Sequence, residues 1–516
     1  MTQTTSRKLY LETFGCQMNV LDSDLVLGQL RAQGLESTDD RDQADVVIYN
    51  TCSVREHAEQ KVWSRLGEMR DAKTSRPDLV IGVIGCMAER DGPDIYRRFP
   101  HVDLLCGPGE LDKLPAMVGN ALRTSHAPSR DVSTKLTALM GATSRRSSTL
   151  DAAAEDSLES LDLSRSISAS DDVRQAYVRI TRGCNKFCTY CVVPYTRGAE
   201  VHRPPQNIID EVTKLTDAGS IEVTLLGQTI NHYAFAHGDG RVTSFAELLY
   251  LIHEAVPHLP RLRFVTSFPR DFTDEALQAM RDCKRICRYL HVPAQHGSDR
   301  VLKLMNRGYT SGEYREFVGR ARDYMPDISL ASDFIVGFPS ETDEEFAQTD
   351  QLLRDCRFKN SFIFKYSPRP GTTAIKRFTD DIPEEVKKRR NNALLATQGE
   401  IALSLNRELI GQTHELMVEG ASKLGSKAAA RNDAYPRSNS KSHPSSNVEL
   451  GIGFPKRKPQ PIVSDISTNM VLTTQLVGRT RGDQIVVFDG PLSLVGKLVD
   501  VTIIDAKQLT LFGKVA

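Results

Sequence analysis

Three cysteines with the spacing C-x3-C-x2-C are the residues best suited to chemistry in this sequence. Cys184, Cys188 and Cys191 follow an apolar, strand-like run at residues 176–181. Three thiolates at this spacing can hold three irons of a [4Fe–4S] cluster and leave the fourth without a protein ligand, unlike the closed C-x2-C-x2-C-x3-C run of bacterial ferredoxins. In radical enzymes the open iron binds S-adenosylmethionine (SAM), and an electron from the cluster cleaves its sulfonium bond to give a 5′-deoxyadenosyl radical.

The alternative for this loop is a zinc knuckle. Structural zinc takes four ligands, usually as two C-x2–4-C pairs. His202 is the nearest spare ligand, and no second cysteine pair follows in the sequence. The spacing therefore favours an open iron–sulfur cluster over zinc.

Further cysteines follow the ends of predicted strands within residues 8–120, where strands alternate with helices in the pattern of a small doubly wound sheet. The predicted strands are residues 8–13, 44–50 and 78–84. Cys16, Cys52 and Cys86 come after them, and the carboxyl ends of parallel strands converge on one crevice. These three can therefore meet around a second cluster, although a free cysteine is more often a small buried packing residue. Cys106 also ends an apolar run, and periodicity alone does not exclude it as a ligand.

Residues 173–407 are predicted to form an incomplete parallel barrel of six β-α units. Their strand-like runs end near Thr181, Gly227, Ser267, Pro293, Gly337 and Ser367. Function in such barrels lies at the carboxyl ends of the strands, which is where the C-x3-C-x2-C loop falls. Polar residues after later strands are candidate cofactor contacts, although each is also typical of an ordinary turn. They are Gln228, Ser267, Gln295 and Gly337.

Residues 408–516 are predicted to form a small all-β barrel. Arg479, Arg481 and Lys497 give it a modest positive surface, which suits RNA phosphates but equally describes a solvated face. Two segments have too little apolar content to form a core. We expect a flexible linker at 121–172 and a disordered, basic insertion at about 424–470.

Composition narrows the class of protein. Lys+Arg and Asp+Glu number 66 each in 516 residues, so nucleic-acid binding must come from local patches. The sequence has no apolar run of membrane-spanning length and a polar N-terminus, which predicts a cytoplasmic protein with no membrane partner. Ten cysteines are too few for a disulfide scaffold, so they are expected to be metal ligands and buried fillers in a reducing compartment.

Six motifs resemble the radical-SAM methylthiotransferase family, and the sequence of the C-x3-C-x2-C loop is most similar to that of its tRNA branch, MiaB. The terminal barrel resembles a TRAM domain. The resemblance covers nearly everything except the two segments of low apolar content. The motifs are Gly15–Asn19 (GCQMN), Asn50–Arg55 (NTCSVR), Gly85–Ala88 (GCMA), Gly183–Gly198 (GCNKFCTYCVVPYTRG), Val223–Gln228 (VTLLGQ) and Ser367–Thr372 (SPRPGT).

The resemblance implies a flavodoxin-like N-terminal domain, a partial (β/α)6 radical-SAM barrel and a TRAM-like RNA-binding barrel. It also implies two [4Fe–4S] clusters. The first is held by Cys16, Cys52 and Cys86, which the resemblance selects over Cys106. The second is held by the C-x3-C-x2-C loop and takes SAM at its open iron.

The implied reaction is methylthiolation at C2 of N6-(dimethylallyl)adenosine beside the anticodon of tRNA. One SAM gives a methyl group to sulfur held at the first cluster, and another SAM yields the radical that takes the ring hydrogen. The implied partners are tRNA, an electron donor such as flavodoxin or ferredoxin, and a sulfur source. The alternatives are methylthiolation of another tRNA base or of a ribosomal-protein aspartate, as in the RimO branch, a non-catalytic iron–sulfur module, and a zinc protein with an RNA-binding tail.

Overall fold

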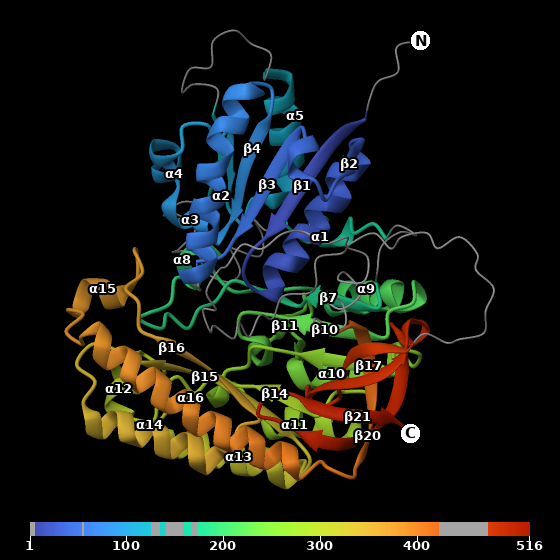
Figure 1. Ribbon diagram of the computed structural model, residues 1–516, viewed down its shortest axis with the longest axis vertical. Coiled ribbons are helices and arrows are strands. Elements are labelled where there is room, and N and C mark those ends of the chain that lie inside the picture. Colours follow the sequence, from blue (N-terminus) through green and yellow to red (C-terminus); the bar gives the residue numbers. More distant parts are fainter. Residues whose placement is uncertain (1–5, 54–55, 125–134, 141–157, 168–172, 423–472) are drawn as a thin grey trace, which may run out of the picture. The chain divides into compact units, whose positions relative to one another are not determined.

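The chain divides into two compact units, Met1–Ile401 and Ala402–Ala516. Figure 1 shows two successive α/β domains in the first unit and a β-barrel, coloured red, in the second. Among the helices described, none combines the length and the apolar character needed to cross a membrane. The computed structural model describes residues 6–53, 56–124, 135–140, 158–167, 173–422 and 473–516.

The N-terminal domain is built on a six-stranded parallel sheet in the order β2-β1-β3-β4-β5-β6. This is the flavodoxin-like order with one extra edge strand, which confirms the predicted fold. The strands are β1 (Arg7–Thr13), β2 (Leu35–Ser37), β3 (Val46–Thr51), β4 (Val80–Gly85), β5 (Leu104–Cys106) and β6 (Leu136–Ala138). The helices are α1 (Gln17–Ala32), α2 (Glu56–Ser75), α3 (Cys86–Asp91), α4 (Pro93–Arg98) and α5 (Leu114–Thr124).

The central strands β3 and β4 are buried along their whole length. Helices α1 and α5 pack against one face of the sheet, and α2, α3 and α4 pack against the other. A strand that is buried on both faces needs a continuous apolar sequence rather than an alternating one. This explains the runs at Val46–Ile48 and Val80–Ile84, and it fixes the strand ends where two of the N-terminal cysteines lie.

The second domain contains six parallel strands in two sheets, β13-β10-β7 and β14-β15-β16, which confirms the predicted partial barrel. An isolated bridge between Leu262 and Ile286 links β13 to the segment before β14. The strands are β7 (Gln175–Arg179), β10 (Glu222–Leu226), β13 (Arg261–Phe264), β14 (Tyr289–His291), β15 (Ser329–Val336) and β16 (Asn360–Lys365). The main helices are α9 (Pro205–Asp217), α10 (Phe245–Ala255), α11 (Asp274–Asp282), α12 (Asp299–Leu304), α13 (Ser311–Tyr324), α14 (Asp343–Cys356) and α16 (Glu384–Arg407).

The C-terminal unit contains a closed barrel in the order β17-β18-β19-β21-β20, as the sequence predicts. Its core consists of alternating apolar residues, including Leu416, Phe488 and Val501, each almost completely buried. The strands are β17 (Thr413–Ala421), β18 (Thr473–Thr480), β19 (Ile485–Pro491), β20 (Leu498–Ala506) and β21 (Leu511–Val515).

The predicted linker at 121–172 is corrected in part by the structure. Within it, β6 adds a strand beside β5, and α7 (Leu158–Leu163) buries Leu158 and Leu161 in the N-terminal core. Helix α7 is also held by charge, because the buried Asp162 lies 2.6 Å from Arg179. Apolar content does not reveal a helix that is held by ion pairs. The rest of this segment, and the predicted insertion at 424–470, lie outside the described residues.

Candidate metal centres

Cys16, Cys52 and Cys86 lie at the carboxyl ends of three strands, and we call them the sheet triad. Cys16 precedes α1 after β1, Cys52 directly follows β3, and Cys86 begins α3 after β4. Because β1 pairs with β3 and β3 pairs with β4, all in parallel, these ends meet at one edge of the sheet.

The cysteines of the sheet triad influence one another directly. A hydrogen bond with Cys52 lowers the pKa of the half-buried Cys16 thiol to about 6. Burial raises the pKa of Cys86, and the nearby Cys16 adds to the increase. Gly15 permits the close approach of the first two loops, because its φ is +123° and a Cβ there would lie 2.3 Å from the Cβ of Cys52.

One side chain from the second domain reaches the sheet triad. The Nη2 of Arg197 donates hydrogen bonds to Asn19 Oδ1 at 3.0 Å and to Asp22 Oδ2 at 2.8 Å, on the helix that follows Cys16. Burial opposes the charge of Arg197, but the charges of Asp22 and of the cysteines hold its pKa well above the usual value. Arg197 therefore places a buried positive charge beside the thiols.

Arg197 belongs to residues 192–198, which we call the bridging segment because they contact both sets of cysteines. Its helix α8 (Val193–Thr196) packs against α3, which begins at Cys86. At its other end, the carbonyl of Gly198 accepts a hydrogen bond from the N–H of Cys184 at 3.2 Å.

Cys106 lies apart from the sheet triad in its contacts. It ends β5 inside the apolar core, and its Sγ donates to the carbonyl of Glu110 at 3.2 Å. Burial raises the pKa of this thiol strongly, and the carboxylates of Glu110 and Asp112 add to the effect. A neutral thiol in the core is the form that these surroundings favour.

Cys184, Cys188 and Cys191 lie on the loop that follows β8 (Thr181–Arg182), and we call them the loop triad. The N–H of Cys191 donates to the carbonyl of Cys188 at 3.0 Å, which folds the loop back on itself. Gly183 has a φ of +68°, and a Cβ there would lie 1.9 Å from the carbonyl oxygen of Ala199. Only glycine allows the two sides of this loop to come so close.

Arg307 is the cation beside the loop triad. Its Nη1 lies 3.4 Å from the Sγ of Cys188, and its Nε donates to the hydroxyl of Tyr309 at 2.8 Å. Burial raises the pKa of the other two thiols, Cys184 and Cys191, so their thiolates need further positive charge. A bound metal cluster would supply that charge.

The donor atoms of the two triads suit iron–sulfur clusters. Among the described residues, only Glu200, His202 and His232 bring three candidate ligand atoms within 4.8 Å of one another. That group contains no sulfur donor, whereas each triad offers thiols alone. Sulfur-only donor sets also suit iron–sulfur clusters.

The predicted cofactor contacts follow the strands as expected. Gln228, Ser267, Gln295 and Gly337 lie in the loops after β10, β13, β14 and β15. The Ser267 hydroxyl is buried and has no hydrogen-bond partner among the described residues, so it is available to a ligand. Gln295 has a φ of +70° and pairs through its backbone with β15, while the N–H of Gly337 donates to the Glu341 carboxylate. Their binding of SAM stays a prediction.

The predicted RNA contacts differ in how available their charges are. Arg479 is paired with Glu419 at 2.7 Å and with Asp483 at 3.0 Å. Arg481 lies 3.7 Å from a carboxylate oxygen of Glu415, whereas Lys497 is exposed. Lys497 is therefore the best placed of the three to meet a phosphate.

Sequence reasoning missed the two arginines that accompany the triads. Arg197 lies in the motif Gly183–Gly198, so the family resemblance included this residue but did not indicate its contact with the sheet triad. Arg307 follows α12, more than a hundred residues after the thiol it contacts, and no local pattern marks it. The Glu200, His202 and His232 group was also missed, although His202 had been considered as a spare zinc ligand.

Comparison with protein families divides the chain into three matched regions. Residues 8–107 match the family described as Uncharacterized protein family UPF0004, residues 178–353 match the Radical SAM superfamily, and residues 471–516 match the TRAM domain. Among solved structures, the radical S-adenosylmethionine methyltransferase TsrM from Kitasatospora setae is 15% identical, with a TM-score of 0.51 over 80% of this chain and 77% of that one. Fold and cysteine loop together define a radical SAM enzyme.

Two curated relatives align along nearly the whole chain. The tRNA-2-methylthio-N(6)-dimethylallyladenosine synthase of Rhodopirellula baltica is 42% identical over 99% of this chain and 96% of its own length. The protein of the same name from Acetivibrio thermocellus is 38% identical over 99% of this chain and 92% of its own. The chain belongs to the family of tRNA-2-methylthio-N(6)-dimethylallyladenosine synthases.

Proposed function

We propose that this chain adds a methylthio group to C2 of N6-(dimethylallyl)adenosine in tRNA. Family membership supports the reaction, and the bridging segment is the structural observation that carries the proposal. Its residues 192–198 contact the sheet triad through Arg197 and the loop triad through Gly198. A reaction that needs both a radical source and a sulfur source requires two centres that are held together in this way.

In this proposal the sheet triad holds one [4Fe–4S] cluster, and the loop triad holds the other, which binds SAM. When bound, these groups supply reductive cleavage of the sulfonium and the sulfur that is transferred. The electron comes from a flavodoxin or ferredoxin, and the sulfur is replenished by a separate source. Three thiols would hold three of the four irons at each triad, and the fourth iron would be able to bind a second molecule.

The chain itself must orient the reactants and exclude water, because no side chain can remove the C2 hydrogen as a proton. Ser267 is buried in the loop after β13, and its hydroxyl has no hydrogen-bond partner in the part of the chain that the structure describes, so it is suited to fix a polar group of SAM. Arg307 is buried against Cys188, and its charge lowers the pKa of the Cys191 thiol, which opposes the effect of burial there. These residues position groups and tune charge; neither transfers a proton in the reaction.

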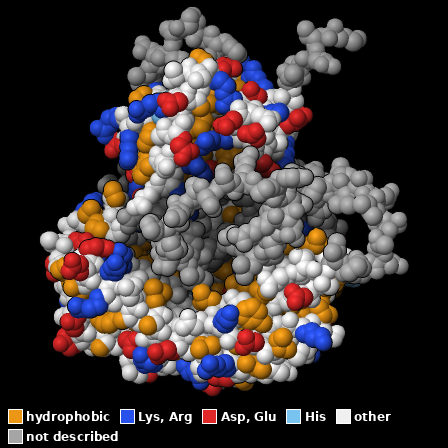
Figure 2. All heavy atoms as spheres, viewed as in Figure 1, with side chains coloured by type: hydrophobic (Ala, Val, Ile, Leu, Met, Phe, Trp, Pro, Cys, Tyr) orange, Lys and Arg blue, Asp and Glu red, His pale blue; other side chains and the backbone are white. Residues whose placement is uncertain are grey.

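Binding of tRNA must rely on local contacts. Figure 2 shows Lys and Arg side chains interspersed with Asp and Glu over the described residues of the face in view, in keeping with the equal totals of 66. Lys497 of the TRAM-like barrel is the exposed cation that we assign to a phosphate. A target base in an anticodon loop also leaves its stack at lower cost than a paired base.

The test is an anaerobic assay of the cluster-loaded protein with SAM and a reductant on three substrates. These are tRNA that carries N6-(dimethylallyl)adenosine, the same tRNA without the prenyl group, and the ribosomal protein that the RimO branch modifies. We expect a methylthio nucleoside from the prenylated tRNA alone. Equal rates on both tRNAs, or modification of the ribosomal-protein aspartate, would contradict the proposed substrate.

A further inference from the structure

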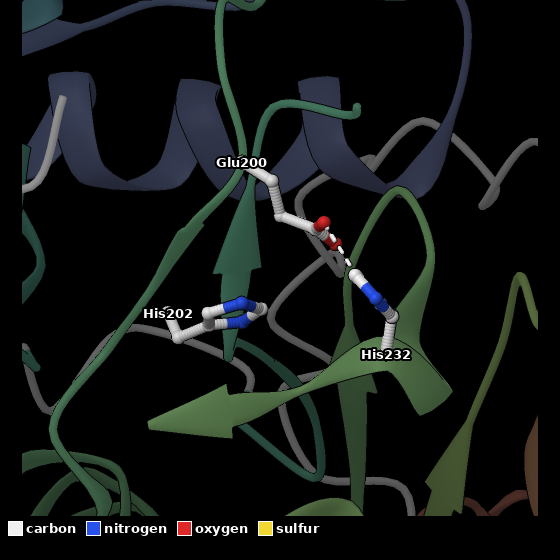
Figure 3. Close-up of side chains that lie close together, drawn as sticks. All are labelled: Glu200, His202 and His232. Carbon is white, nitrogen blue, oxygen red and sulfur yellow. Dashed lines mark hydrogen bonds and ion pairs between the residues drawn. The ribbon is translucent and has the colours of Figure 1, made fainter. Parts of the chain in front are cut away.

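Outside the two triads, three residues that can ligate metals converge beside the loop triad. Glu200 immediately precedes β9 (Val201–His202), His202 ends that strand, and His232 ends the short 3-10 helix η5 (Ile230–His232). Figure 3 shows the carboxylate of Glu200 and the ring of His232 pointing toward one another, with the ring of His202 beside them. One ligand atom from each residue lies within 4.8 Å of the other two.

Two atoms of this group are buried without a hydrogen-bond partner in the described part of the chain. The side chain of Glu200 is 1% exposed; its Oε2 accepts from His232 Nδ1 at 2.7 Å, but its Oε1 has no partner. The Nδ1 of His202 is also buried and unpartnered. Buried polar atoms are normally satisfied, so two orphan atoms in one group indicate that something else binds there.

A simple ion pair does not account for the group. A charged His232 paired with Glu200 explains the contact at 2.7 Å, and that hydrogen bond raises the pKa of His232. It leaves the second carboxylate oxygen and His202 unexplained. Besides Glu200, the charges that act on the pKa of His232 are those of Lys186 and Asp271, which pair with each other.

The donor set selects the kind of ion. Two imidazole nitrogens and one carboxylate oxygen are the ligands of zinc sites that keep a fourth position open. They also suit other divalent first-row transition metals, whereas magnesium and calcium prefer oxygen donors alone. His202 ends β9, Glu200 lies one residue before that strand, and His232 ends a short helix, so the backbone fixes their directions.

We propose that Glu200, His202 and His232 bind one divalent transition-metal ion, with Zn²⁺ as the simplest occupant and one coordination position left open. This site is separate from the six cysteines and takes no sulfur ligand.

The surroundings suggest what such an ion does. The N–H of Glu200 donates to Asn185 Oδ1 at 3.1 Å, next to Cys184 on the cluster loop. On the other side, Thr229 Oγ1 lies 3.5 Å from the Sγ of Cys184 and starts the turn that carries His232. An ion held between β9 and η5 would therefore fix the two segments that flank Cys184.

The experiment uses protein with both clusters assembled, so that the cysteines are occupied and cannot capture zinc. Zn²⁺ alone is added, loosely bound metal is removed by dialysis, and zinc and iron are counted in the same sample. We expect one zinc per chain, and zinc X-ray absorption with nitrogen and oxygen neighbours near 2.0–2.1 Å and no sulfur neighbour near 2.3 Å.

The matched variants are His202→Asn, His232→Asn and, as a control, His258→Asn, which alters an exposed histidine outside the group. The first two should bind zinc at least about tenfold more weakly at unchanged iron content, and the control should match the unmodified protein. Absence of bound zinc, sulfur in the zinc shell, or equal zinc affinity in all variants would overturn the proposal. None of these readouts requires tRNA or turnover, so they are independent of the proposed function.

Discussion

All three cysteines of the loop triad fall within residues 184–191, whereas the sheet triad collects its cysteines from three strand ends spread over residues 16–86. The loop triad is placed by local geometry, through Gly183 and the hydrogen bond between Cys191 and Cys188. The sheet triad is placed by strand pairing, so it exists only when the whole sheet has folded. The same kind of donor set can thus be specified by a short motif or by topology.

The two triads also differ in where their accompanying cation comes from. Arg307 belongs to the same domain as the loop triad, while Arg197 reaches the sheet triad from the other domain. The cation beside the sheet triad, Arg197, is therefore close to it in space but distant from it in sequence. The integrity of the sheet triad should depend on the contact between domains, and that of the loop triad should not.

The largest expected effect comes from Cys188→Ala in the loop triad. Loss of one thiolate removes the centre that delivers an electron to SAM, so the variant should form neither 5′-deoxyadenosine nor methylthio nucleoside. It should keep about half of the iron, because the sheet triad is untouched. Both products and the iron content are measured anaerobically in one preparation. Residual 5′-deoxyadenosine at the level of the unmodified protein would show that the radical centre lies elsewhere.

Cys52→Ala should separate the two triads. This variant also loses about half of its iron, but the loop triad remains, so SAM should still be cleaved to 5′-deoxyadenosine. No sulfur should be inserted, and the cleavage should be uncoupled from product. The same assay measures both quantities. Full methylthiolation by Cys52→Ala would mean that the sheet triad is not the sulfur centre.

Arg197→Met tests the dependence of the sheet triad on the second domain. The change leaves the buried Asp22 with Arg179 as its remaining partner, and breaking such a buried pair typically costs about 3–5 kcal/mol of unfolding free energy. Denaturant unfolding measures the loss, and iron content should fall first at the sheet triad. Arg241→Met is the control, since both side chains of its ion pair with Glu247 are exposed and the loss should cost under about 1 kcal/mol. Equal losses in the two variants would contradict the special role of Arg197.

Cys106→Ala should have a smaller effect than any change to the triads. Its thiol is buried in the apolar core, so the variant loses packing and one weak hydrogen bond, or roughly 1 kcal/mol. Iron content and both products should match the unmodified protein. Loss of about half of the iron would make Cys106 a ligand and would remove one member of the sheet triad.

The sequence predicted features that depend on local patterns and missed those that depend on contacts between distant residues. Buried β-branched runs predicted three strands of the N-terminal sheet, the partial barrel and the terminal β-unit, because apolar periodicity is local. The short edge strands β2 and β6 were not predicted. The choice of Cys52 over Cys106 needed family resemblance, since both end apolar strands. Periodicity could not place Arg197, Arg307 or the pairing of Asp162 with Arg179, because these contacts join residues distant in sequence. Charged pairs that become buried carry no apolar signal, which is also why α7 was predicted as linker.

The smallest effect is expected from removal of residues 424–470, on which neither triad draws. Strands β17 and β18 are antiparallel neighbours in the barrel, with Ala421 opposite Leu476. The N–H of Ser422 donates to the carbonyl of Gln475 at 2.8 Å, so these described residues on the two sides of the deletion already lie side by side.

A short flexible link suits such a pair of strands, and shortening a long connection lowers its closure entropy. We expect full iron content and a melting temperature within about 4 °C of the unmodified protein, which corresponds to less than roughly 1 kcal/mol for a barrel of this size. Calorimetry and iron analysis check both quantities. Binding of tRNA at several salt concentrations tests the basic residues of 424–470, because their removal would reduce the salt dependence of binding if they contact phosphates. Insoluble protein, or loss of iron from either triad, would show that residues 424–470 support the fold.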